Sequence, residues 1–320
     1  MKIVILDSTT ANPGDLSWDF LKKYGDLTVY DRTPPSMVPS RGRGADILII
    51  NKTVISRESI DQMPGVKLIA LLATGYNVVD CEAAAAHGIL VANIPSYSES
   101  AVAQQTFAFI LEYANRVGIH ADMVRSGAWT HCNDFSFTAA PLTELAGKTL
   151  GVIGFGRIGR RVARIAEGFD MNVLVNTAHP EKYAEYPYRF LPLDTLLPQC
   201  DFVSIHCPMT PATAKMVNAD FLSKMKDGAF LVNNARGGEV DEAAVASALK
   251  SGKLGGMGAD VLSTEPPMAD NPLLSAPNVY ITPHIAWAGR ETRVRLMGIL
   301  EQNIAAFING APQNIVNASC

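Results

Sequence analysis

Residues 149–160 read TLGVIGFGRIGR, and this stretch decides how the rest of the chain is interpreted. An apolar run at residues 150–153 leads into Gly154, Gly156 and Gly159, and the following segment, RRVARIAEGF, is typical of a helix. In such a strand, turn and helix the first glycine permits the sharp turn, the second lets a pyrophosphate approach the backbone, and the third lets helix and strand pack closely. The N–H groups that start the helix form an anion site. The stretch therefore predicts a site for a nicotinamide dinucleotide, and an ordinary glycine-rich loop is the alternative.

Length and composition limit the class of protein. With 320 residues the chain is long enough for two domains, and 48% apolar with 18% charged residues is typical of a compact globular protein. The net charge of −4 and the lack of a Lys/Arg cluster argue against a nucleic-acid partner. No apolar run reaches the roughly eighteen residues that a membrane span needs. The first residues, MKIVILDSTT, predict a β-strand and not a signal peptide.

The cysteines indicate neither a disulfide framework nor a metal site. Their number is odd and no C-x-x-C spacing occurs among Cys81, Cys132, Cys200, Cys207 and Cys320. We therefore expect incidental thiols, no metal, and a cytoplasmic protein.

Short apolar runs alternate with helix-like segments along the whole chain, which predicts parallel sheets in α/β layers. The first series has strands at 3–6, 28–30, 47–50, 68–72 and 90–92, with helices at 15–24 and 79–87 and a Pro- and Gly-rich loop at 31–44. The second series, which the glycine stretch opens, has strands at 172–175, 202–206, 229–233, 256–261 and 279–282 and helices at 193–197, 219–225 and 241–250. Two five-strand series predict two doubly wound, Rossmann-like domains.

Two longer segments have the pattern of helices that cross between these domains. Residues 98–116 form one, with Ser98 or Ser100 as N-cap, and residues 289–309 form the other, which returns the chain to the first domain. The expected division is a first domain of residues 1–97 plus 289–320, with a cofactor domain of residues 98–288 inserted in it.

Three polar residues each follow a predicted strand of the second series. Arg236 lies in FLVNNARGGEVDE, Glu265 in GADVLSTEPP and His284 in NVYITPHIAWAG. Taken singly, each has another interpretation: Arg236 as a surface or capping residue, Glu265 as a solvated turn residue, and His284 as a core histidine. Because ligands bind beyond the carboxyl ends of parallel strands, their joint placement favours a site instead.

The three residue types suit the reduction of a 2-oxo acid. Arginine offers a charged fork of donors that holds a carboxylate and polarises a carbonyl. Histidine gives or takes a proton near neutral pH. A carboxylate that is hydrogen-bonded to the other ring nitrogen favours the imidazolium form and fixes its orientation.

The motifs GVIGFGRIG, NNARGGEVDE, GADVLSTEPP and ITPHIAWAG resemble those of the D-isomer-specific 2-hydroxyacid dehydrogenases, over essentially the whole chain. The resemblance implies a flavodoxin-like substrate domain beside the cofactor domain, and catalytic roles for Arg236, Glu265 and His284. Segment LLATGYNVVD is similar to the family loop that holds the substrate carboxylate, which implicates Thr74 and Gly75 with Arg236 and His284 in substrate binding. Together with NIPSYSESAVAQ it most resembles the glycerate dehydrogenase (hydroxypyruvate reductase) branch.

The resemblance also implies a set of cofactor contacts, with one departure from the family pattern. The set is Gly154, Phe155, Gly156, Arg157, Ile158, Gly159, Asn176, Cys207, Ala235, Asp260, His284, Ala286 and Gly289. The departure is Asn176, which stands where a site selective for NAD shows Asp or Glu. Asparagine does not repel a 2′-phosphate, and His179 and Lys182 are weak substitutes for an arginine that would bind one. NAD is the expected cofactor, with NADP as the open alternative.

Other functions remain as alternatives at this point. The same fold and triad resemble those of corepressors that bind partner peptides, and formate dehydrogenases are similar but have glutamine where Glu265 stands. A phosphoglycerate dehydrogenase with a regulatory domain is not expected, because those proteins carry a long C-terminal extension. The substrate is expected to be glycerate/hydroxypyruvate or glyoxylate, and which 2-hydroxy acid is used stays open. The family also suggests a homodimer with residues 107–113 at its interface.

Overall fold

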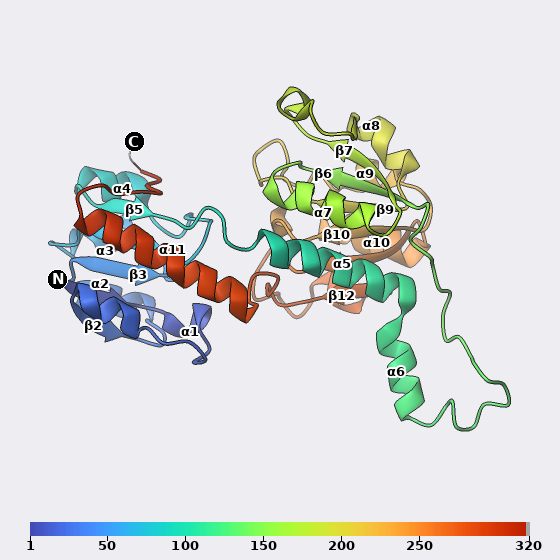
Figure 1. The fold of residues 1–320 in the computed structure, drawn as a ribbon, viewed down its shortest axis with the longest axis horizontal. Helices are drawn as coiled ribbons and strands as arrows, with labels where there is room; N and C mark the ends of the chain where they lie inside the picture. Colours follow the sequence, from blue (N-terminus) through green and yellow to red (C-terminus); the bar gives the residue numbers. More distant parts are fainter. Residues whose placement is uncertain (318–320) are drawn as a thin grey trace. The chain divides into compact units, whose positions relative to one another are not determined.

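The structure, a computed structural model, describes residues 1–317; Cys320 and the last residues of the expected first domain lie outside this range. The chain divides into two compact units: Met1–Ser98 with the segment that starts at Ala288 is unit 1, and Glu99–Trp287 is unit 2. Each unit contains one parallel sheet with helices around it (Figure 1). The predicted α/β class with two doubly wound sheets is confirmed.

Unit 1 is built on five parallel strands in the order β2-β1-β3-β4-β5. Their bounds are β1 (Lys2–Ile5), β2 (Asp26–Val29), β3 (Ile47–Ile50), β4 (Leu68–Leu71) and β5 (Leu90–Ala92). The helices are α1 (Ser8–Ala11), α2 (Val38–Gly42), α3 (Arg57–Asp61), α4 (Cys81–Ala86) and α11 (Arg290–Ile308). Every residue of β3 and β4 is buried, as expected for central strands covered on both faces.

Two local predictions in unit 1 were wrong. The helix expected at residues 15–24 is only a 3-10 helix, Asp19–Tyr24, because the Asn12 side chain binds the backbone of Gly14 and Leu16 and holds that stretch as a loop. The loop expected at residues 31–44 contains the 3-10 helix Pro35–Met37 and α2. Each of these begins with a proline in its first two positions, where proline favours a helical start.

Unit 2 is built on seven parallel strands in the order β12-β11-β10-β9-β6-β7-β8. Their bounds are β6 (Thr149–Ile153), β7 (Asn172–Asn176), β8 (Arg189–Phe190), β9 (Phe202–Ile205), β10 (Ala229–Asn233), β11 (Leu254–Ala259) and β12 (Val279–Ile281). The helices are α5 (Glu99–Asn115), α6 (Val117–Arg125), α7 (Arg157–Glu167), α8 (Leu193–Leu196), α9 (Ala219–Lys224) and α10 (Glu242–Ser251). Edge strand β8 was not predicted, because two residues are too few to form a pattern.

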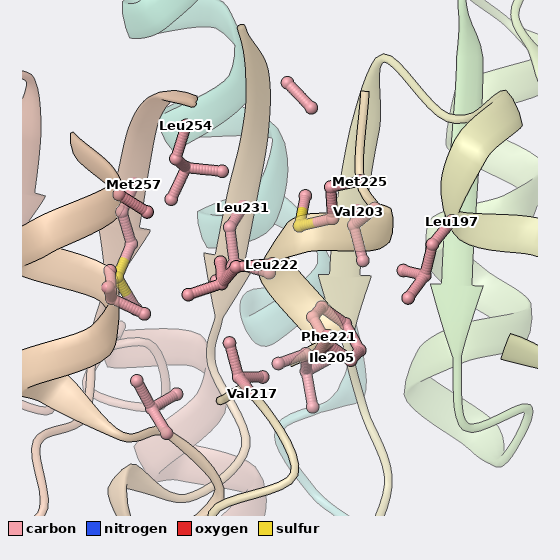
Figure 2. Close-up of a cluster of buried hydrophobic side chains, with 14 of the residues drawn as sticks. Leu197, Val203, Ile205, Val217, Phe221, Leu222, Met225, Leu231, Leu254 and Met257 are labelled. Atoms are coloured by element: carbon pink, nitrogen blue, oxygen red, sulfur yellow. The ribbon is translucent and has the colours of Figure 1, made fainter. Parts of the chain in front are cut away.

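The core of unit 2 fixes the central strands of its sheet. Apolar side chains of β9, β10 and β11 meet those of α9 and the segment before it in one buried hydrophobic cluster (Figure 2). Strand order reverses at β6, which pairs with β9 on one side and β7 on the other. The glycine turn after β6 therefore lies at the switch point of the sheet, where such folds bind ligands.

The two long helices each pack within a single unit and do not run between units, which corrects their interpretation as linkers. Helix α5 packs on α7 and β10 in unit 2, and α11 packs on β4 in unit 1. Arginines in the first turns of α11 hold the chain where it enters and leaves unit 1: Arg293 donates to the Ala288 carbonyl oxygen at 2.9 Å and Arg295 to that of Tyr97 at 3.1 Å.

The suggested interface stretch, residues 107–113, is largely part of the core of unit 2. Phe107, Phe109 and Ile110 are buried within the chain itself, so they offer no apolar surface to a partner. The exposed apolar side chains of this region lie instead on α6 and after it. In the described part of the chain, no helix is long and apolar enough to cross a membrane.

Candidate active site

The glycine turn has the geometry that the sequence predicts for a dinucleotide cradle. Gly154 has φ of +91°, and a Cβ there would lie 2.5 Å from the backbone nitrogen of Cys207. A Cβ on Gly159 would collide with the Gly154 carbonyl oxygen, whereas one on Gly156 would meet nothing within 4 Å. Helix α7 starts after Gly156 with no side-chain cap, so the N–H groups of its first turn face the open side of the turn. These residues fit a pyrophosphate at the start of α7.

Glu265 and His284 form a hydrogen-bonded pair. Nδ1 of His284 lies 2.7 Å from Oε2 of Glu265, and Oε1 of Glu265 accepts from the Leu262 N–H at 3.1 Å. The carboxylate is thereby held on both oxygens, and the imidazole is fixed in one orientation. Because Nδ1 is bound to the carboxylate, Nε2 is the ring nitrogen available for proton exchange with a substrate.

Asp260 holds the loop that presents His284. The buried Asp260 carboxylate accepts from the Thr282 hydroxyl at 2.6 Å and from the N–H groups of Ile285 and Ala286, both at 2.8 Å. His284 itself has φ of +55°, and its N–H donates to the Asp260 carbonyl oxygen at 2.8 Å. Burial raises the pKa of Asp260 above its usual range, against the hydrogen bonds that lower it. The resemblance implied a cofactor contact for Asp260; that its carboxylate holds the loop of His284 was not predicted.

Arg236 shares this edge of the sheet. Strands β10, β11 and β12 pair in register at Asn233, Ala259 and Ile281, so the residues just beyond them lie at the same edge. The buried Asn233 side chain shapes the turn: its amide donates to the Arg236 carbonyl oxygen at 2.8 Å, and its oxygen accepts from the Ala235 N–H at 3.0 Å. The guanidinium is exposed and donates to the Ala235 carbonyl oxygen at 2.7 Å.

The end of β7 carries Asn176. Its Nδ2 donates to the Leu191 carbonyl oxygen at 2.9 Å, which leaves Oδ1 as an acceptor. His179, which follows, pairs with Glu181 at 3.3 Å. The segment between β7 and β8 is anchored by aromatic rings packed edge-on around the buried Phe155, namely Tyr183, Tyr186, Tyr188 and Phe190, with centroid distances from 5.2 to 5.5 Å. With its ring in this cluster, Phe155 presents only backbone atoms to the glycine turn.

Thr74 and Gly75 lie in unit 1, in the segment after β4. The Thr74 hydroxyl donates to the Ile94 carbonyl oxygen at 2.7 Å, and the Asn93 side chain donates to the Thr74 carbonyl oxygen at 2.8 Å. The neighbouring loop after β3 is held by the buried Asp7, which follows β1. Its carboxylate accepts from three successive N–H groups, those of Asn51, Lys52 and Thr53, at 2.6 to 2.8 Å.

Comparison with known proteins decides the family. Residues 107–286 match the model of the NAD binding domain of the D-isomer specific 2-hydroxyacid dehydrogenases. The chain is 45% identical over 321 residues to a hydroxypyruvate reductase of Blautia hydrogenotrophica, covering 99% of this chain and all of that one. The chain belongs to the D-isomer specific 2-hydroxyacid dehydrogenase family.

Two further similarities extend over the whole chain of this dehydrogenase. It is 39% identical over 320 residues to a glycerate dehydrogenase of Methylorubrum extorquens, covering 99% of both chains. Its structure matches the crystal structure of the TT0316 protein of Thermus thermophilus with a TM-score of 0.88 and 37% identity, covering 99% of this chain and all of that chain.

The family membership confirms the predicted class of activity. The protein is an oxidoreductase that transfers a hydride between a nicotinamide dinucleotide and a 2-hydroxy acid or the corresponding 2-oxo acid. The alternatives of a corepressor-type binding protein and of a formate dehydrogenase are not favoured.

Proposed function

We propose that the protein is a hydroxypyruvate or glyoxylate reductase in which His284 is the acid–base group, Glu265 its partner and Arg236 the ligand of the substrate carboxylate. The hydrogen bond of 2.7 Å between His284 and Glu265 supports this proposal most strongly, because it lies at the sheet edge that also carries Arg236. Thr74 and Gly75 complete the proposed substrate-binding set.

The proposed roles follow from the chemistry of each group. The bound nicotinamide ring supplies the hydride that reaches C2 of the oxo acid. Nε2 of His284 gives its proton to the carbonyl oxygen, so that a hydroxyl group forms, and the neutral imidazole then regains a proton from water. The Glu265 carboxylate stabilises the imidazolium before this transfer. Arg236 binds the carboxylate through two N–H groups and polarises the carbonyl.

The proposed substrate class rests on the two relatives named above, a hydroxypyruvate reductase and a glycerate dehydrogenase. The test is a panel of hydroxypyruvate, glyoxylate, pyruvate and phenylpyruvate, each with NADH and with NADPH. We expect the highest kcat/KM with hydroxypyruvate or glyoxylate. A clear preference for phenylpyruvate would refute the proposed substrate class while leaving the family intact.

For the cofactor we propose NAD, with measurable use of NADP. The proposed contacts are those implied by the resemblance: the turn residues Gly154–Gly159, Asn176, Cys207, Ala235, Asp260, His284, Ala286 and Gly289. Oδ1 of Asn176 is a suitable acceptor for a ribose hydroxyl because the other end of the side chain is held by Leu191. The neutral amide brings no charge that would repel a 2′-phosphate.

We also propose a role for each domain and an oligomeric state for the protein. Residues 1–97 with 289–320 would form the substrate domain and residues 98–288 the cofactor domain. A homodimer formed through α6 and the segment after it is supported by exposed apolar side chains there, those of Val117 and Trp129 and, at 91% exposure, Phe135. We also propose a cytoplasmic location, because the spacing of the cysteines in the sequence is not typical of a disulfide framework. Light scattering of the purified protein tests the dimer, which Phe135→Asp would weaken.

A further inference from the structure

Glu239 is a carboxyl group that the reaction described so far does not use. It ends the 3-10 helix Gly237–Glu239, directly after Arg236, and its side chain is completely buried. A carboxyl group is rarely buried in this way unless its oxygens have partners, so its contacts identify its role.

Both oxygens of Glu239 are bound, each to a different loop. Oε2 accepts from the backbone N–H of Arg236 at 3.3 Å, and Oε1 accepts from the thiol of Cys207 at 3.6 Å. Cys207 follows β9 and lies against Gly154 of the glycine turn. The Glu239 carboxyl group thus joins the loop of the proposed substrate ligand to the loop beside the cofactor cradle.

We propose that Glu239 is a positioning residue that fixes Arg236 relative to the cofactor cradle and, through its own proton, sets how strongly Arg236 binds the substrate carboxylate. This proposal rests on the role proposed above for Arg236.

The titration of Glu239 agrees with this geometry. Burial raises the pKa of Glu239 to about 7, against the hydrogen bonds from Arg236 and Cys207 and the Arg236 charge, which lower it. Burial likewise raises the pKa of Cys207 to about 12, so the thiol keeps its proton and remains a donor. Of the neighbouring charged residues, Asp241 caps α10, and Lys215 binds the Gly238 carbonyl oxygen through its backbone N–H. Of these residues, Arg236 is the one whose charge acts on the Glu239 carboxyl group.

The bridge persists in both protonation states. A neutral Glu239 still accepts from the Arg236 N–H with one oxygen, and its O–H donates to the sulfur of Cys207. What changes is the charge: the ionised carboxylate offsets the positive charge of Arg236, whereas the neutral acid leaves it free for the substrate. Carboxylate binding is therefore expected to weaken roughly three- to tenfold as pH rises through 7.

The experiment isolates this effect from the titration of His284. The dissociation constant of oxamate, the unreactive amide analogue of a 2-oxo acid, is measured by NADH fluorescence from pH 5.5 to 8.5 in His284→Asn. We expect weaker binding above pH 7 in this variant. In Glu239→Gln/His284→Asn, binding should stay at its low-pH strength throughout, because glutamine keeps both hydrogen bonds but carries no charge. An identical pH dependence in the two proteins refutes the proposal.

Two controls separate the possible failures. If Arg236→Gln/His284→Asn binds oxamate as tightly as His284→Asn, the proposed role of Arg236 is wrong and the role of Glu239 fails with it. If Arg236→Gln weakens binding but Glu239→Gln leaves the pH dependence intact, only the Glu239 proposal is wrong. Infrared difference spectra of the unmodified protein between pH 6 and 8 cover the case in which a variant does not fold. We expect a protonated-carboxyl band that is present at pH 6 and lost at pH 8. If no such band is lost, the proposal is also refuted.

Discussion

The sheets of the two units use the same device at their carboxyl edges, with different results. In unit 1, Asp7 follows β1 and its carboxylate holds the loop after the neighbouring β3 by three backbone N–H groups. In unit 2, Asp260 follows β11 and its carboxylate holds the loop after the neighbouring β12 by two N–H groups and a hydroxyl. In both units, a buried carboxylate that follows one strand fixes the loop that follows the neighbouring strand of the sheet.

The difference lies in what each loop carries. The loop held by Asp7 is Asn51–Thr53, which contains no group that titrates near neutral pH. The loop held by Asp260 carries His284, and Glu265 is bound to it. The same kind of anchor therefore holds a backbone loop in unit 1 and, in unit 2, the loop that carries the proposed proton-transfer residue His284. We infer that the anchor positions the loop, and that the residue the loop carries decides which chemistry is possible there.

The largest effect is expected from removing that residue. His284→Asn should lower kcat roughly a hundredfold or more, because a positioned acid–base group contributes about that much. The affinity for NADH, measured by fluorescence titration, should change little. A loss of NADH binding with unchanged turnover per bound cofactor would limit His284 to its proposed contact with the cofactor and refute its acid–base role.

A smaller effect should separate the two anchors. Asp260→Asn places an amide where two N–H groups need acceptors, and each buried mismatch costs about 1–3 kcal/mol. The loop is expected to move, so that kcat falls roughly tenfold. Asp7→Asn is the matched variant: it should lower Tm comparably and change kcat less than twofold. Equal losses of kcat in both variants would contradict the distinction drawn between the units.

The pairing of Glu265 with His284 is tested by a pH profile. Glu265→Gln removes the negative charge that stabilises the imidazolium, and reduction needs the protonated ring. The alkaline limb of kcat/KM for reduction should therefore move to lower pH. An alkaline limb at the same pH in both proteins would show that the hydrogen bond of 2.7 Å between His284 and Glu265 does not affect proton transfer.

The smallest effect concerns the cofactor. Asn176→Asp should raise KM for NADPH severalfold more than KM for NADH, because a carboxylate repels a 2′-phosphate. The substitution also removes the hydrogen bond from Nδ2 to the Leu191 carbonyl oxygen, so some loss of affinity for both cofactors is expected. The measurement is kcat/KM for both cofactors in both proteins. If the natural protein already rejects NADPH by about a thousandfold, another group reads the ribose.

Motifs that are local in sequence allowed most of the fold to be predicted. The glycine turn predicted the strand before it and the start of α7, and the apolar runs located the strands except for the two-residue β8. The order of Arg236, Glu265 and His284 after successive strands predicted one shared sheet edge, and the expected bond between carboxylate and ring is present. Their catalytic roles remain predictions.

What the sequence did not predict depends on partners distant along the chain. Nothing near Glu239 indicates that its oxygens meet Cys207, 32 residues earlier, nor does anything near Asp7 point to residues 51–53. The failed helix at residues 15–24 has a local cause that propensity does not capture, since one asparagine side chain competes with helical hydrogen bonds.

The insertion of unit 2 within unit 1 determines the order in which the protein is completed during synthesis. Leu296, Leu300 and Ile304 of α11 fill the core of unit 1, yet about 190 residues of unit 2 are made first, which takes on the order of 10 to 40 s. Throughout that interval the apolar surface that α11 covers has no partner. The core of unit 1 is thus incomplete while unit 2, which is continuous in sequence, is synthesised and can fold. We therefore expect the opening hundred residues to be exposed to chaperones and to aggregation for longer than any part of unit 2.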